Sequence, residues 1–276
     1  MTEGRGAAVM TANAGPGGAT AGAASAGAAA GPSIGLYLSE PARGLASLAQ
    51  LPLASPWLAS APRGDGHGVL VLPGFLASDY STTVLRRFVG RLGYEVAGWN
   101  LGRNRGPTPG VLAGLPGQLA ALAEQAGGKV SVIGWSLGGI YARELARRHP
   151  GQVRQAITLG SPFALTDERQ SRAGAAYRRF EHLHAPGRDD RREFLAEPLA
   201  VPSTAVYSRQ DGIVAWRACV APESALHENV EVRCAHLGFG TDPATMWAIA
   251  DRLAVPAGQW RPFQPPPALR SLYPGR

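Results

Sequence analysis

Short runs of aliphatic and β-branched residues alternate along this chain with longer segments in which apolar residues recur every three or four positions. Such runs are typical of strands buried on both faces, and the longer segments have the period of amphipathic helices. The predicted strands cover residues 68–72, 94–99, 130–133, 153–159, 203–207 and 229–232, and the predicted helices begin near Ser81, Thr108, Ser136 and Thr241. Strands and helices in alternation predict an α/β fold, a doubly wound and mostly parallel sheet with right-handed crossovers.

The chain before the first predicted strand divides into two parts. Residues 1–33 carry almost no large apolar side chains and many glycines. They cannot bury enough surface to offset the entropy of ordering, so we expect a disordered tail. Residues 34–67 are apolar and predict a helical extension, with a short helix over 41–50 that Pro52 ends. This extension either packs on the core or, because Leu and Trp with few charges suit a lipid surface, makes a peripheral membrane contact through residues 34–62.

A long insertion interrupts the alternation of strands and helices. Residues 163–200 separate two core strands, which is far longer than an ordinary connection, and they are dense in charge. They predict a cap over the sheet, inside an α/β domain that covers residues 68–256. The aromatic residues of the cap are Phe163, Tyr177, Phe180 and Phe194. The proline-rich residues 257–276 predict an irregular tail on the surface.

The segment Gly134-Trp135-Ser136-Leu137-Gly138 has the pattern GxSxG and lies between a predicted strand and a predicted helix. A serine in a strained turn crowds the residues two before and two after it, so both must lack a side chain, as Gly134 and Gly138 do. The helix that follows directs its free N–H groups and positive dipole end toward an oxygen beside the hydroxyl. Ser136 is the predicted nucleophile; the alternative is an ordinary serine in a glycine-rich turn.

A serine hydroxyl needs a base to take its proton, and the base needs an acid that fixes its tautomer. Of the six histidines, only His236 follows a predicted core strand at its carboxyl end. Asp211 follows the preceding strand in the same way. Glu223 is the alternative acid, and the alternative role of Asp211 is that of a turn aspartate ahead of Gly212. The sequence therefore predicts a triad of Ser136, Asp211 and His236, in that chain order.

Acyl transfer also needs N–H groups that point at the developing oxyanion. The backbone N–H of Leu137 is one predicted donor. The other is the N–H of Phe75, in the loop after the first core strand, where Gly74 lets the backbone approach; the alternative is that Pro73 and Gly74 only turn the chain. The predicted apolar substrate pocket is formed by Leu76, Trp135 and Phe163.

Three motifs and one histidine give residues 68–254 a family resemblance. They are LVLPGF at 70–75, VIGWSLGG at 132–139, YSRQDGIV at 207–214, and His236 ahead of the last helix. They resemble the α/β-hydrolase family, and within it the bacterial lipases and esterases similar to the PGAP1-like and class 2 lipases. Members of that group commonly have His-Gly where this chain has Pro73-Gly74. The resemblance implies a cofactor-free serine hydrolase, an esterase or lipase acting on small-molecule or lipid esters.

Two other functions remain open at this stage. An acyltransferase or lipid-remodelling enzyme uses the same triad with an alcohol in place of water. A non-catalytic lipid-binding protein keeps the fold without the reaction. Product analysis with a competing alcohol separates a hydrolase from an acyltransferase, and covalent labelling by a fluorophosphonate probe separates it from a non-catalytic protein.

The charge of the chain changes little in this picture. The formal net charge is +7 and the isoelectric point is about 10.0, but Lys129 is the only lysine and the arginines are scattered in pairs. This pattern is typical of a GC-rich genome and argues against nucleic acid as a partner. His182 and His184 lie among charged residues, and we expect them to be solvated, with no metal ligand among them.

Cysteine content and targeting signals place the protein only loosely. Cys219 and Cys234 are too few for a disulfide framework, and they form either one bridge or two buried thiols. No segment approaches the roughly 20 apolar residues of a membrane-spanning helix. The N-terminus has no convincing secretory signal, so a cytoplasmic location is expected.

Overall fold

A computed structural model describes residues 30–186 and 197–276. Within these ranges the chain forms a six-stranded sheet of order β2-β1-β3-β4-β5-β6, in which every neighbouring pair is parallel. The strands are β1 (Gly68–Leu72), β2 (Glu95–Gly98), β3 (Val130–Trp135), β4 (Val153–Leu159), β5 (Ser203–Ser208) and β6 (His227–Val232). The predicted α/β class and parallel sheet are confirmed. Residues 1–29 of the tail predicted over 1–33 lie outside the described residues, as does Phe194 of the predicted cap.

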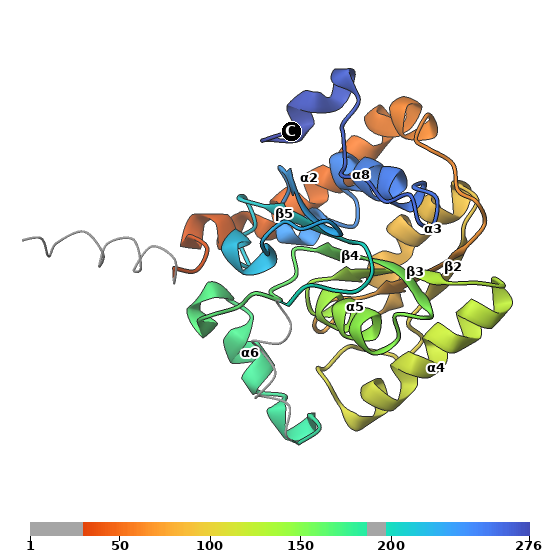
Figure 1. The fold of residues 1–276 in the computed structure, drawn as a ribbon. Helices are drawn as coiled ribbons and strands as arrows, with labels where there is room; N and C mark the ends of the chain where they lie inside the picture. Colours follow the sequence, from red (N-terminus) through yellow and green to blue (C-terminus); the bar gives the residue numbers. More distant parts are fainter. Residues whose placement is uncertain (1–29, 187–196) are drawn as a thin grey trace, which may run out of the picture.

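Helices cover both faces of the sheet (Figure 1). The α-helices are α2 (Ile34–Ala59), α3 (Thr83–Arg91), α4 (Pro109–Gln125), α5 (Leu137–Arg148), α6 (Gly174–Arg178) and α8 (Pro243–Leu253). Short 3-10 segments are η1 (Asp79–Thr82), η2 (Glu168–Gln170), η3 (Glu181–Leu183), η5 (Trp216–Cys219), η6 (His236–Gly238) and η7 (Pro267–Leu272). Helices α4 and α5 pack on one face, and α2, α3 and α8 pack on the other.

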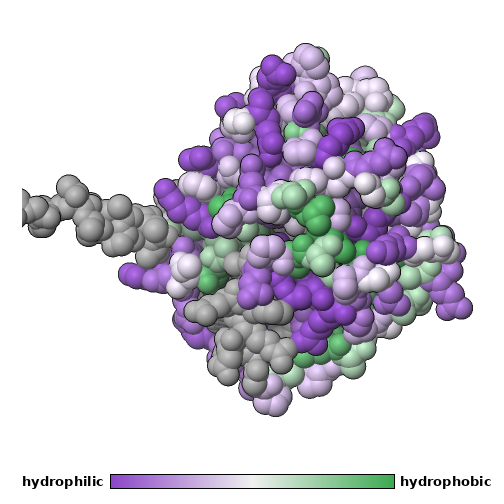
Figure 2. Space-filling view, viewed as in Figure 1, coloured by the Kyte–Doolittle hydropathy of each residue, from purple (hydrophilic) through white to green (hydrophobic). Residues whose placement is uncertain are grey.

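The two faces of the sheet follow from the alternation of side chains along each strand. In β1, Val69 and Val71 join the core beneath α2, α3 and α8, whereas Leu70 and Leu72 join the core beneath α4 and α5. All five residues of this strand are buried, as expected for a parallel sheet covered on both sides. The molecular surface is mainly hydrophilic in the view of Figure 2, and the hydrophobic residues on it gather near the middle of that view.

Most predicted elements appear within a residue or two of their expected bounds. The helix predicted from Thr108 begins there, since the Thr108 side chain accepts a hydrogen bond from the N–H of Val111. The helix predicted to begin near Ser81 is α3, which begins at Thr83 after the 3-10 turn η1. The Asp79 carboxylate at the start of that turn accepts hydrogen bonds from the N–H groups of Trp99 and Asn100, which ties the turn to the end of β2.

The N-terminal extension departs most from its prediction. We expected a short helix that Pro52 ends, but α2 continues for 26 residues with Pro41, Pro52 and Pro56 inside it. All three prolines are exposed, so the carbonyl groups that lose their N–H partners can turn toward water. Packing of the opposite face against η6 and α8 keeps the helix continuous.

The C-terminal segment also differs from its prediction of an irregular surface tail. Phe263 and Tyr273 are each only 1% exposed, and their rings pack edge to face at 4.8 Å between centroids. The Tyr273 hydroxyl donates a hydrogen bond to the carbonyl oxygen of Ala244 at the start of α8. These residues therefore extend the core beneath α8.

Candidate active site

Ser136 lies in a strained turn between β3 and α5. Its backbone has φ 53° and ψ −120°, in the positive-φ region that residues other than glycine avoid. A Cβ on Gly134 would lie 2.2 Å from the carbonyl oxygen of Gly138, and one on Gly138 would lie 2.4 Å from that of Leu72. Both positions exclude any side chain, as the GxSxG spacing predicts. The turn lifts a half-buried serine above the carboxyl end of the sheet.

Asp211 and His236 form a buried acid–base pair after β5 and β6. The Nδ1 atom of His236 lies 2.6 Å from Oδ2 of Asp211, and the two residues are 4% and 3% exposed. The other carboxylate oxygen, Oδ1, accepts hydrogen bonds from the N–H groups of Ile213 at 2.8 Å and Val214 at 2.7 Å. These two bonds orient the carboxylate, so that Oδ2 is left for the imidazole.

Opposing influences set the proton affinity of this imidazole. Burial disfavours the charged imidazolium, but the Asp211 carboxylate, with a smaller contribution from Glu40, outweighs burial and raises the pKa of His236 above its ordinary value. The pair therefore stabilises the imidazolium that forms when a base takes a proton.

The strand order brings the three predicted residues to one edge of the sheet. Ser136 follows β3, Asp211 follows β5 and His236 follows β6, all at their carboxyl ends. The indole N–H of Trp135, next to the serine, donates a hydrogen bond of 3.1 Å to the carbonyl oxygen of His236. Gly160 directly follows β4, the strand between β3 and β5, and a Cβ on it would lie 3.1 Å from Oδ2 of Asp211. Within the described ranges no hydrogen bond joins the Ser136 hydroxyl to the imidazole.

The loop after β1 lies against the nucleophile, where the oxyanion donors were predicted. A Cβ on Gly74 would lie 3.3 Å from Cβ of Ser136. Among the described residues, no acceptor takes the backbone N–H of Phe75. Leu137 is the first residue of α5, so its N–H has no acceptor within the helix. Both predicted donors are therefore available to a bound oxygen.

Asn104 supports this loop, and the sequence analysis missed it. Its side chain is fully buried and donates a hydrogen bond of 2.9 Å to the carbonyl oxygen of Pro73. Its backbone pairs with the loop in both directions, since Leu76 N–H donates to the Asn104 carbonyl and Asn104 N–H donates to the Ala77 carbonyl. Leu76 has φ 59°, a second strained position beside the serine. Asn104 holds the loop in that conformation.

The three predicted pocket residues occupy different environments. Leu76 is 38% exposed in the loop beside Ser136. Trp135 is half-buried, with its ring beside Gly240. Phe163 is 1% exposed and packs under the guanidinium of Arg143 and against the ring of His227, at the opposite end of β6 from His236. The structure thus places Trp135 directly before Ser136 and Leu76 in the loop whose Gly74 lies against Ser136, and it directs Phe163 into the body of the protein.

Aromatic residues of the predicted cap meet the loop after β1. The ring of Phe75 lies 5.4 Å from that of Tyr177 and 5.8 Å from that of Phe180, between centroids. Tyr177 also contacts His184, whose Nε2 lies 3.0 Å from the carbonyl oxygen of Arg105. The described part of the insertion is therefore anchored next to the predicted oxyanion donors.

A second Ser-His-Asp set in the chain has a different environment. His67 Nδ1 lies 2.5 Å from Oδ1 of Asp65, and its Nε2 lies 2.7 Å from Oγ of Ser131. Burial lowers the pKa of His67 below its ordinary value despite the Asp65 carboxylate. Ser131 is fully buried within β3, at the amino end of the strand, where no substrate can reach it. This set satisfies buried polar groups and has no role in our assignment.

Glu40 is the second site residue that the sequence analysis missed. It is 2% exposed on the inner face of α2, and its carboxylate accepts backbone N–H groups from both the Asp211 and the His236 loops. A signal for it was present, because Glu40 and Arg43 are the only charged residues in the 26 residues of α2. An isolated acid in an apolar helix indicates a buried partner.

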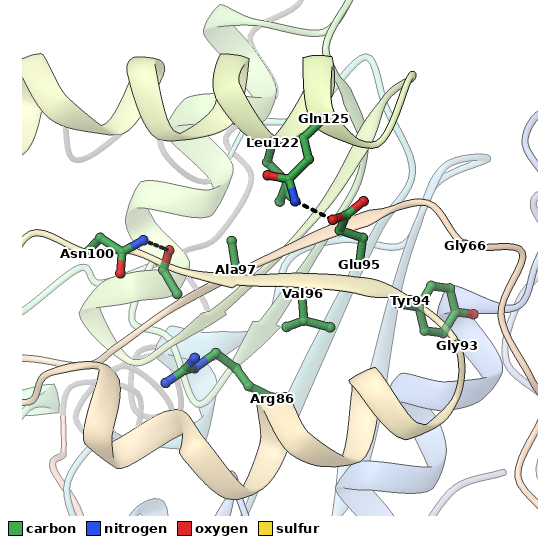
Figure 3. Close-up of a pocket in the computed structure, with 11 residues that line it drawn as sticks. Gly66, Arg86, Gly93, Tyr94, Glu95, Val96, Ala97, Asn100, Leu122 and Gln125 are labelled. Carbon is green, nitrogen blue, oxygen red and sulfur yellow. Dashed lines mark hydrogen bonds between the residues drawn. The ribbon is translucent and has the colours of Figure 1, made fainter.

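Other candidate binding features fall outside this edge of the sheet. Over the described ranges no cluster of three His, Cys, Asp or Glu residues could hold a metal ion, and Cys219 and Cys234 are free and buried. A shallow hollow of about 650 Å³ lies along the edge strand β2. Figure 3 shows Arg86 reaching it from α3, and Gln125 from α4 bonded to Glu95. None of the three predicted triad residues lines this hollow.

Comparison by sequence finds no matching family model and no matching curated protein. Comparison by structure finds Aspergillus fumigatus lipase B (18% identity, TM-score 0.55, covering 73% of this chain and 55% of that one). It also finds a metagenome-derived lipolytic enzyme described with LipS and LipT (17% identity, TM-score 0.52, covering 70% and 93%). Est1E from Butyrivibrio proteoclasticus is similar over 70% of this chain and 89% of that one (12% identity, TM-score 0.51). In the described residues no helix is both long and apolar enough to cross a bilayer. The chain has the α/β-hydrolase fold, matching lipases and esterases by structure.

Proposed function

We propose that this protein is a serine hydrolase that cleaves carboxylic esters through an acyl-enzyme on Ser136. The observation that carries the proposal is the buried pair of His236 and Asp211, with 2.6 Å between Nδ1 and Oδ2, at the same sheet edge as a serine with φ 53°. An imidazole oriented in this way is a general base, and a strained, half-buried serine is the nucleophile it serves.

The reaction uses four groups of the chain. The Oγ atom of Ser136 attacks the ester carbonyl carbon while Nε2 of His236 takes its proton, and the carbonyl electrons move onto oxygen. The backbone N–H groups of Phe75 and Leu137 hold that oxyanion. The intermediate collapses by breaking the bond to the alcohol oxygen, which receives the proton from Nε2. A water molecule repeats the sequence on the acyl-enzyme and releases the acid and the free serine.

The surroundings favour an apolar acyl or aryl group. Leu76 is exposed in the loop after β1, and the ring of Phe75 in the same loop forms an aromatic cluster with Tyr177 and Phe180. Aromatic rings bury a large apolar area without needing a charged partner. Small esters with an apolar acyl chain fit this arrangement better than highly charged substrates.

The peripheral lipid contact predicted for residues 34–62 belongs to the same proposal. Helix α2 exposes several large apolar side chains outside its buried face, a pattern found in helices that lie on membranes. These exposed side chains are Ile34, Tyr37, Leu38, Leu45, Leu48 and Leu53, with Leu53 at 83% exposure.

A fluorophosphonate probe and nitrophenyl esters of rising chain length test the proposal. We expect the wild type to be labelled at Ser136 and to hydrolyse the esters, and we expect Ser136→Ala to lose both properties by several orders of magnitude. The matched control is Ser131→Ala, which removes the buried hydroxyl of the second Ser-His-Asp set. Labelling that survives in Ser136→Ala would contradict the assignment, and a competing alcohol that captures the acyl group would identify an acyltransferase.

A further inference from the structure

Glu40 is a buried acid outside the predicted triad. It lies on the inner face of α2 with Ser47, Ala54 and Leu58, and its side chain is 2% exposed. A carboxylate in such a place is costly unless hydrogen bonds replace its water. Its partner on the same helix is Arg43, whose Nη2 lies 3.0 Å from Oε1 of Glu40.

The remaining partners of Glu40 are backbone N–H groups of the two loops that carry the acid and the base. Oε1 accepts from Gly212 at 2.7 Å and from His236 at 2.9 Å, and Oε2 accepts from Leu237 at 2.9 Å. Gly212 directly follows Asp211. One side chain thus joins both members of the acid–base pair through the backbone, across 172 and 196 positions of sequence.

Close backbone packing fixes both loops on α2. A Cβ on Gly212 would lie 2.4 Å from the carbonyl oxygen of Leu36, and a Cβ on Gly238 would lie 2.7 Å from Oγ of Ser47. Arg43 adds a hydrogen bond of 2.7 Å to the carbonyl oxygen of Gln210, immediately before Asp211. The helix therefore contacts the chain on both sides of Asp211, and it contacts His236 and the two residues that follow it.

We propose that Glu40 is a positioning residue, which holds the loops of Asp211 and His236 at the separation that their hydrogen bond requires. The inference rests on the proposed function, because it assigns these loops to the reaction. Charge-assisted bonds to N–H groups are shorter and stronger than neutral ones. Three of them on one carboxylate suit the rigid alignment that general-base catalysis needs.

Glu40 also acts on the base through its charge. Charged groups on the elements around His236 are Asp211, Glu40 and Arg43 on α2, and Asp242 at the start of α8. Burial keeps the neighbouring Cys234 neutral by raising the pKa of its thiol. Glu40 favours the imidazolium. Arg43, which pairs with Glu40 on the same helix, carries a positive charge, and a positive charge disfavours a nearby imidazolium. Loss of Glu40 therefore lowers the pKa of His236, and loss of Arg43 raises it.

The test compares pH profiles of ester hydrolysis for the wild type, Glu40→Gln, Glu40→Asp and Arg43→Gln, with active sites counted by fluorophosphonate labelling. In Glu40→Gln, kcat should fall by about 10- to 100-fold, the cost of small misplacements of catalytic groups, with KM little changed. The acid limb of its kcat profile should move to lower pH, because the Glu40 charge that favours the imidazolium is lost. Glu40→Asp keeps the charge and should keep the limb in place, whereas Arg43→Gln should move it to higher pH.

Glu228→Gln is the matched control. Glu228 is equally buried, pairs with Arg252 at 2.9 Å and accepts the N–H of Phe263 at 2.7 Å, but it lies at the amino end of β6. This variant should lose stability and leave the acid limb unmoved. Equal kcat and an unmoved limb in Glu40→Gln would overturn the inference. If Glu40→Gln does not fold, Arg43→Gln decides it, since a limb that stays or moves to lower pH is the contrary result.

A spectroscopic measurement separates this inference from the proposed function. The pKa of His236 can be followed by NMR of histidine-labelled protein without any turnover. If the wild type neither hydrolyses esters nor reacts with the probe, the proposed function fails. Even then, a His236 pKa that is lower in Glu40→Gln than in the wild type would support the proposed action of Glu40 on the Asp211 and His236 loops. An unchanged pKa would refute it.

Discussion

Replacement of Asp211 by Asn is the most informative single change at the candidate site. Oδ1 of Asp211 accepts the N–H groups of Ile213 and Val214, and Oδ2 faces Nδ1 of His236. An amide has only one acceptor oxygen, so in Asp211→Asn that oxygen should stay with the two backbone donors. The NH₂ group is then left opposite Nδ1 of His236. The imidazole must accept a hydrogen bond at Nδ1 and carry its proton on Nε2, where it cannot take the proton of Ser136.

This change of tautomer should leave the fold intact and remove the base. The equivalent change in Ser-His-Asp enzymes lowers kcat by about 10⁴-fold, which corresponds to about 5.5 kcal/mol of lost transition-state stabilisation. The assay is kcat for a short-chain nitrophenyl ester, alongside the rate of fluorophosphonate labelling, with urea unfolding as a check on folding. Glu223→Gln is the matched control, because Glu223 was the alternative acid. Retention of more than a tenth of the wild-type kcat in Asp211→Asn would refute the assignment of the acid.

Three further predictions concern the base, the oxyanion loop and the exposed helix. The pKa of His236 is raised above its ordinary value of about 6.5, so the imidazole should become protonated, and lost as a base, at a pH above that value. A pH profile of kcat should therefore decline on its acid side with a midpoint above about 6.5. Asn104→Ala leaves the Pro73 carbonyl unpaired. In kinetic assays kcat should fall by about 10-fold or more, and in urea titrations the free energy of unfolding should fall by about 1–3 kcal/mol. An unchanged kcat would show that Asn104 does not support the oxyanion loop in the reaction. Replacing Leu38, Leu45 and Leu53 by Ser should reduce the fraction of protein that sediments with phosphatidylglycerol vesicles and leave hydrolysis of short soluble esters unchanged. If the variant sediments as much as the wild type, any lipid contact lies elsewhere.

Sequence reasoning placed Ser136, Asp211 and His236 together because each follows a strand of a parallel sheet. Carboxyl ends of parallel strands share one edge, so three residues far apart in sequence can be assigned to one place once the strands are recognised. The glycines that flank Ser136 were predictable for a local reason, since the turn leaves no room for a Cβ at either position. These inferences need only parallel strands and local sterics.

Long-range packing made other features unpredictable. Pro52 indicates the end of a helix when only its neighbours are considered, but α2 continues because its opposite face is buried against η6 and α8. Phe163 follows a core strand and was assigned to the pocket, yet its ring packs toward Arg143 and His227. Asn104 lies in a loop rich in glycine and proline, where asparagine is a common turn residue. In each case the deciding partner is distant in the sequence.

The two residues that the sequence analysis missed have a common physical basis. Asn104 and Glu40 bond mainly to backbone groups of the catalytic loops, and a backbone partner leaves no trace in the identity of the residue that it meets. The side chains that react are fixed by chemistry and can be recognised by type and order. The side chains that hold them can be any acceptor or donor of the right length, contributed by any element that packs nearby. Here one comes from a helix before the first strand, so removal of that helix should impair the acid–base pair even though every residue of the triad remains.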